Sequence, residues 1–80
     1  MWIVAQHGIL VNLNHVKKIM TISIDLFSGN EQFNVVGIDL NDKETVLQSF
    51  DTDTQAEAYI ATLAQKLYKW GMQHGENEEH

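Results

Sequence analysis

The order of apolar and polar positions divides this chain into a strand-rich first part and one helix. Before residue 51, short runs alternate apolar and polar residues, which is typical of strands with one buried face. After it, apolar residues recur every three or four positions, which is typical of an amphipathic helix. The pattern therefore predicts an α+β fold, in which an antiparallel meander of four or five short strands packs against one C-terminal helix. The predicted strands span about residues 2–5, 9–12, 17–26, 32–40 and 44–50, and the predicted helix spans about residues 53–70.

The C-terminal helix carries clear start and stop signals. Thr52 and Gln55 have the spacing of a capping box, in which the threonine oxygen accepts a hydrogen bond from a first-turn amide. Thr54 and Glu57 have the same spacing, so the sequence leaves two alternative starts about two residues apart. Gly71 follows the last apolar position, and we expect it to close the helix in the left-handed conformation. The helix should therefore bury one face of the sheet with a single apolar stripe. The residues of that stripe are Ala56, Tyr59, Ile60, Leu63, Leu67 and Trp70.

Asparagines interrupt the strand pattern between residues 12 and 15. Asparagine side chains readily bond to nearby backbone groups, so Asn12 to His15 should form a tight corner or one helical turn, with Leu13 and Val16 turned inward. A second irregularity lies in the strand of residues 32–40, where the apolar positions change face near Val36. Either a bulge at this point or burial of the strand on both faces accounts for the change.

Both faces of the predicted sheet carry apolar side chains, although one helix can cover only one face. Ile3, Ile19 and either Val35 or Val36 lie opposite the main apolar set of their strands. Either the sheet curls into a half-barrel or a second copy of the chain covers the other side, and two-fold dimers are the commonest oligomers. We therefore predict a homodimer. Its candidate interface residues are Ile3, Ile19, Val35 and Tyr68, the last of which lies off the helical stripe.

Size and charge limit the classes of function. Eighty residues form one small domain, which we place at residues 1–71, followed by an acidic tail over 72–80 that we expect to be disordered. The net charge of −6 and the absence of arginine disfavour direct nucleic-acid binding, which depends on cations set against phosphates. The first eleven residues match neither a signal peptide nor a membrane span, and there is no cysteine. We expect a cytoplasmic protein with no membrane association.

The residues that could carry catalysis are not arranged for it. His7 and His15 lie in separate turns, and His74 and His80 lie in the tail, so no pair has the spacing of a metal site. Aspartates lie at turns and at the helix start, where they have local structural roles. We therefore predict no catalytic residue, no cofactor site and no metal site, and we expect that the protein is not an enzyme.

Three functions remain open at this stage. The first is a non-enzymatic interaction module that self-associates through the sheet face left uncovered by the helix and binds an unidentified protein partner. The second is an acidic inhibitor or regulator that occupies the nucleic-acid-binding site of a partner, which requires Asp25, Asp39, Asp42 and Glu44 to form one patch that mimics phosphates. The third is a small-ligand or metal-binding regulatory domain, which depends on His7 and His15 meeting near a cupped sheet.

Two short motifs also resemble those of small bacterial and phage proteins of this size. The first is Val11-Asn12-Leu13-Asn14-His15-Val16, an "NLxxV" corner, and the second is Phe50-Asp51-Thr52 followed by Ala56 at the helix start. The resemblance covers residues 2–70, and both motifs are structural. It implies a β-meander followed by one helix and a bacterial or phage origin, and it implies no activity or site residue.

Overall fold

The computed structural model describes residues 1–71 and has the expected α+β class. The prediction of a disordered tail concerns residues 72–80, which lie outside the described part. Each observed strand begins and ends within about two residues of its predicted bounds, and the helix has the bounds expected for it. The elements are β1 (Trp2–Val4), β2 (Leu10–Asn12), β3 (Val16–Asp25), β4 (Glu31–Asp39), β5 (Glu44–Phe50) and α1 (Asp53–Trp70).

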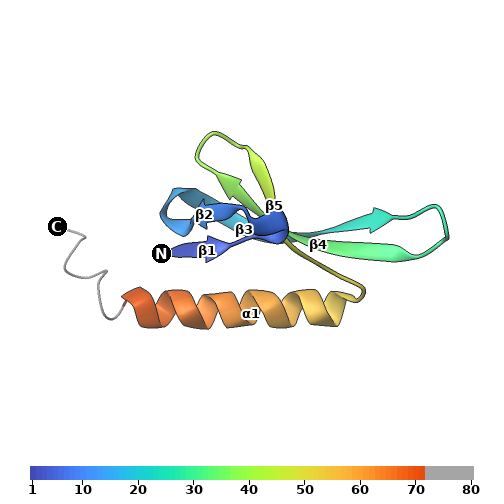
Figure 1. The fold of residues 1–80 in the computed structure, drawn as a ribbon. Coiled ribbons are helices and arrows are strands. Elements are labelled where there is room, and N and C mark those ends of the chain that lie inside the picture. The colour runs from blue at the N-terminus through green and yellow to red at the C-terminus, as the bar shows by residue number, and fades with distance from the viewer. Residues whose placement is uncertain (72–80) are drawn as a thin grey trace.

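The strands form two sheets instead of one continuous meander (Figure 1). β1 and β2 make a separate hairpin, and β3, β4 and β5 make an antiparallel sheet in that order. The break between the sheets is the predicted corner, a single 3₁₀ turn over Leu13–His15. The Asn12 side chain accepts a hydrogen bond from the Asn14 amide at 3.0 Å, and Leu13 is buried. Because this turn redirects the chain, β2 does not pair with β3.

The start of α1 is as predicted, and its end is different. The Gln55 amide donates to the Thr52 hydroxyl oxygen at 3.2 Å, which confirms Thr52 as the N-cap. The prediction of a left-handed Gly71 is wrong, because Gly71 has a φ of −62° and its amide still donates to the carbonyls of Leu67 and Tyr68. The helical hydrogen-bond pattern therefore extends through Gly71.

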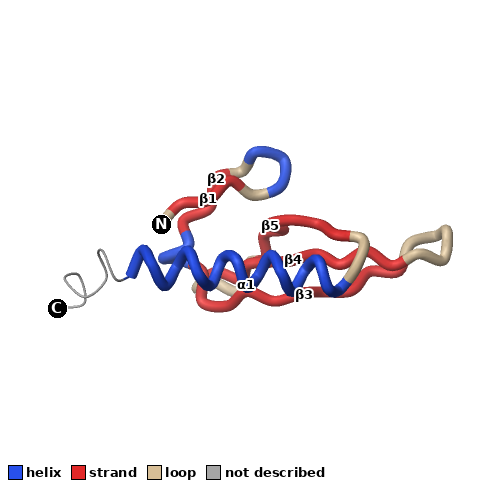
Figure 2. Tube along the Cα trace, turned by 90° about the horizontal axis from the view of Figure 1, so that it is seen from below, coloured by secondary structure: helices blue, strands red, loops and turns tan. Residues whose placement is uncertain are grey.

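The apolar stripe of α1 packs on the three-stranded sheet (Figure 2), and the β1–β2 hairpin joins the same core. On α1, Ala56 and Leu63 are buried and contact Val35 and Leu47 of the sheet together with Ala5. Near the start of the helix, the ring centroid of Tyr59 lies 5.5 Å from that of Phe50 on β5. Partial burial of Tyr59 in this contact raises the pKa of its hydroxyl.

The helix covers the opposite face of the sheet from the one that the sequence analysis assigned to it. Ile19 and Val35 face α1, whereas the main apolar set of β3, which includes Met20, lies on the other side. Phe33 and Val35 on β4 pack in the core, and antiparallel pairing sets Thr21 opposite Val35 and Ser23 opposite Phe33. This register fixes which side of β3 faces the helix, because directly opposite residues share a face.

The change of face along β4 has two structural causes. The extra residue lies on β5, where the partner of Val35 is Gln48 and the partner of Val36 is Val46, so Leu47 forms the bulge. In addition, Asn34, Val35, Val36 and Gly37 are all buried, so residues of the central strand are buried on both faces although α1 packs on only one of them. The alternative of two-sided burial is therefore confirmed, and the bulge lies on the neighbouring strand and not on β4.

Candidate functional site

The face of the three-stranded sheet opposite α1 carries apolar side chains from all three strands. We call this the uncovered face, because the hairpin and the helix both pack on the other side (Figure 1). In sheet register, Met20 lies beside Val36 and Val46, and Ile22 lies beside Asn34 and Ser49. The apolar residues of the uncovered face are Met20, Ile22, Ile24, Val36, Ile38 and Val46.

Exposure on this face is concentrated on β3. Met20 is 36% exposed and Ile24 is 40% exposed, whereas Val36 on the central strand is 1% exposed. The reason is the strand order: β4 is flanked by two strands, and among the strands that the structure describes β3 has a neighbour only on one side. The part of the face that a partner could bury is therefore the β3 side.

Within residues 1–71, the free edge of β3 presents backbone groups that have no strand beside them. The Leu26 amide donates to the Asn30 carbonyl, and the Leu40 amide donates to the His15 carbonyl. In the register between β3 and β4, the residues of β3 that form hydrogen-bonded pairs with β4 are therefore the even-numbered ones, such as Met20, Ile22 and Ile24. Antiparallel pairs alternate between bonded and non-bonded positions. The amide and carbonyl groups that point away from β4 are consequently those of Ile19, Thr21, Ser23 and Asp25. Such an edge is a template for pairing with another strand.

Opposite charges lie at the two ends of β3. Lys17 and Lys18 lie at its start, and Asp25 lies at its end with Glu31 directly across on β4. Lys17 also forms an ion pair with Asp42 in the turn between β4 and β5. The central residues of the edge, from Ile19 to Ile24, carry no charge, so nothing there repels a second strand.

Two more apolar features flank the same edge. An open groove of about 300 Å³ runs between the start of β3 and the helix. Val16, Lys17, Lys18 and Ile19 line it on the strand side, and the apolar residues Ile60, Leu63, Ala64 and Leu67 line it on the helix side. At the opposite end, Phe27 is fully exposed in the turn between β3 and β4. This turn projects beyond the first turn of α1 (Figure 2). We call the β3 edge, its exposed side chains Met20 and Ile24, the groove and Phe27 together the β3 surface.

The structure separates the four residues predicted as an interface. Val35 is fully buried in the core, and Ile3 and Ile19 are partly buried against the same core. Tyr68 is 70% exposed on α1, away from the sheet residues that contact the helix. These four side chains therefore do not form one surface. Along and just beyond β3, the exposed apolar residues that sequence reasoning missed are Met20, Ile24, Leu26 and Phe27, and an aromatic residue next to Ser-Gly-Asn in a turn was the available signal for Phe27. Other exposed apolar side chains lie on the hairpin, namely Trp2, Val4, Ile9 and Leu10.

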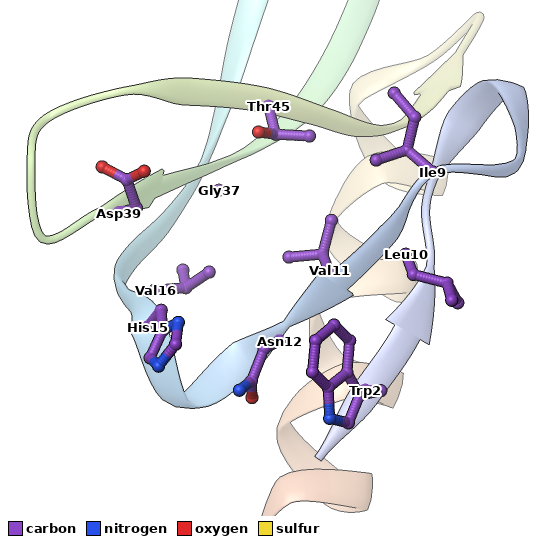
Figure 3. A pocket seen from close by; sticks show the side chains of 10 residues that line it. All are labelled: Trp2, Ile9, Leu10, Val11, Asn12, His15, Val16, Gly37, Asp39 and Thr45. Carbon is purple, nitrogen blue, oxygen red and sulfur yellow. The ribbon is translucent and has the colours of Figure 1, made fainter.

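A second candidate site is a cavity of about 270 Å³ between the hairpin and the end of the sheet (Figure 3). Trp2, Leu10 and Val11 line it from the hairpin, and His15 and Asp39 lie on its other side. His7 is not among its lining residues, because it lies at the tip of the hairpin, at the other end of β2 from His15. Among residues 1–71, no group of three or more metal-ligating side chains comes together.

Asp39 has the local role in a turn that was expected of it. One oxygen of Asp39 accepts from the backbone amides of Lys43 at 2.9 Å and Asn41 at 2.8 Å. The Lys43 amide is the main reason that the pKa of Asp39 is below its usual value. Asp39, Asp42 and Glu44 lie in or beside the turn between β4 and β5. Asp25 lies at the end of β3, near the turn between β3 and β4, and this turn points in a different direction (Figure 1). The acidic side chains named for phosphate mimicry are thus split between two turns.

Within residues 1–71, the one helix is not apolar enough over its length to cross a membrane. Comparison of the sequence with known protein families, with curated proteins and with solved structures finds no match.

Proposed function

We propose that this protein is a non-enzymatic interaction module that self-associates into a homodimer through the β3 side of its uncovered face. The observation that carries the proposal is the exposure of apolar side chains along an unpaired edge strand: Met20, Ile24 and Phe27 are all exposed beside a row of outward backbone groups. Burial of apolar surface is the main driving force of association, and an exposed apolar edge strand is costly unless another chain covers it.

Two features support a second copy as the occupant. First, the β3 edge has both charge signs, with lysines at one end and a carboxylate at the other, so it can match its own copy in the antiparallel direction. Second, β5, the other edge of the sheet, is partly occupied by the chain itself. The Gln6 side chain amide donates to the Ser49 hydroxyl at 3.1 Å across that edge. The β3 edge is therefore the better surface for another strand.

The other two functions receive less support. The division of the acidic side chains between two turns, and the ion pair of Asp42 with Lys17, weaken the case for a continuous surface that imitates phosphates. The cavity lined by His15 and Asp39 is open, and Asp39 already accepts two backbone hydrogen bonds, so few polar groups remain to orient a ligand.

The test is the mass of the protein in solution, measured by light scattering after size exclusion over a range of concentrations. We expect a dimer at high micromolar concentration and a shift to monomer on dilution. Met20→Asp should shift the equilibrium to monomer at every concentration, because it adds a charge to the exposed apolar side chains of β3. The control is Val4→Asp, a similar change at an exposed position of the hairpin, which should leave the dimer intact. A wild-type monomer at all concentrations would contradict the proposal.

A further inference from the structure

We infer that two copies pair along β3 in the antiparallel direction, about a two-fold axis that passes beside Thr21. This inference rests on the proposed self-association and specifies its geometry. The two sheets would join into one continuous sheet, with three strands from each copy and both helices on the same side.

The backbone limits the possible registers. Only Ile19, Thr21, Ser23 and Asp25 point their amide and carbonyl groups outward, so a second β3 must meet them with the same odd-numbered set. An axis beside Thr21 sets Thr21 opposite the partner's Thr21 and Ile19 opposite the partner's Ser23. Each of these pairs can exchange both of its backbone hydrogen bonds. Every outward group of the uncharged part of the strand is then satisfied.

Opposite charges favour this register over the registers that differ from it by a shift of two residues. An axis beside Thr21 sets Lys17 opposite the partner's Asp25, at both ends of the paired strands. If the strands slide by two residues, Lys17 falls opposite the partner's Ser23 or the partner's Phe27, and the complementary charges separate. Attraction between opposite charges across an interface fixes register more than it adds affinity. Lys17 is exposed beside Asp42 in the single chain, so its long side chain can reach either carboxylate.

The same register brings apolar surfaces together on both faces of the joined sheet. On the uncovered face, Met20 lies beside the partner's Ile22, and the exposed Ile24 lies beside the long aliphatic side chain of the partner's Lys18. Beyond Asp25, the turn with Leu26 and Phe27 extends to the partner's Val16, at the mouth of the groove between β3 and α1. The fully exposed Phe27 ring then lies next to the apolar groove. One axis therefore accounts for the free edge, the charges, the groove and the exposed ring.

A covalent trap tests the axis directly, because the chain has no cysteine of its own. Residues opposite each other in a bonded antiparallel pair have Cα atoms about 5.5 Å apart, within the range of a disulfide. Under mild oxidation, Thr21→Cys should give a disulfide-linked dimer at concentrations where the wild type is dimeric. Ala61→Cys, on the exposed side of α1, is the control and should remain unlinked. If the wild type is a dimer and Thr21→Cys links no faster than Ala61→Cys, the axis is wrong and the self-association stands.

A second pair of variants separates the β3 surface from the helix surface without disturbing the fold. Phe27 and Tyr68 are both exposed aromatic residues, so a change to serine at either position removes little buried surface from the single chain. Phe27→Ser should weaken dimerisation about tenfold or more, as loss of a buried aromatic anchor does. Tyr68→Ser should leave the dimerisation constant unchanged. A loss of dimerisation with Tyr68→Ser but not with Phe27→Ser would overturn the inference, and a monomeric wild type would remove the proposed function on which it rests.

Discussion

Asn34, in the middle of the central strand, has a buried side-chain carbonyl oxygen that accepts no hydrogen bond within residues 1–71. It lies on the uncovered face between Ile22 and Ser49. The Ser49 hydroxyl is engaged with the Gln6 side chain, with which it exchanges hydrogen bonds at 3.1 and 3.3 Å. A buried carbonyl without a donor is unfavourable, so Asn34 contributes little to stability through polar interactions.

Asn34→Leu should therefore leave the free energy of unfolding unchanged or raise it by about 1 kcal/mol, because leucine has a similar shape and no polar atom to desolvate. Denaturant unfolding measures the change. Asn34→Asp is the companion variant and should destabilise the fold, since it places a charge in the same buried site. A loss of about 2 kcal/mol or more with leucine would show that the amide is satisfied in solution.

Asp39 provides a prediction for pH dependence. Its folded-state pKa is lowered, chiefly by the Lys43 amide, so its contribution to stability is present above the unfolded-state pKa of about 4 and is lost as the pH falls through the folded-state value. Asp39→Ala should therefore reduce the unfolding free energy more at pH 7 than in acid. Asp39→Asn keeps an oxygen acceptor and removes the charge, so it should lack this part of the pH dependence. Equal effects of Asp39→Ala at both pH values would contradict the prediction.

At the scale of elements, α1 is the element on which the core depends most. Leu63 is buried against Val35 and Leu47, near the middle of the helix. Leu63→Ala should lower the free energy of unfolding by about 2–5 kcal/mol, the usual range for an emptied leucine site. Thr52→Ala should cost about 1 kcal/mol, because it removes the N-cap oxygen that accepts from the Gln55 amide. Chemical denaturation of both variants gives the order, and a larger loss for Thr52→Ala would contradict this account of the core.

The elements themselves could be predicted because their signals are local. A periodic stripe and a capping threonine define α1, and asparagines next to Leu13 define the corner before β3. The last helical residue of α1 was predicted correctly, but the left-handed conformation expected for Gly71 was wrong, since glycine permits that conformation and does not impose it. The assignment of the two sheet faces was wrong for a different reason. Alternation within β3 gives two faces, and pairing with β4 decides which of them the helix covers.

At the scale of the whole molecule, the candidate site depends on the order of the strands in the sheet, which no single segment of the sequence determines. The exposure of Met20 and Ile24 follows from the position of β3 at the edge of the sheet, and strand order is a long-range property. The sequence did predict that apolar side chains would occupy both sheet faces. It could not predict that the exposed part would lie on β3, or that Val35 and Ile19 would lie in the core.

Amide hydrogen exchange on β3, measured residue by residue at increasing protein concentration, tests the central claim most directly and needs no variant. In the single chain, the amides of Met20, Ile22 and Ile24 are bonded to β4, whereas those of Ile19, Thr21 and Ser23 point outward. We expect the first set to be protected at every concentration and the second set to become protected only as the dimer forms. Fast exchange of the Ile19, Thr21 and Ser23 amides at concentrations where the protein is dimeric would contradict pairing along β3.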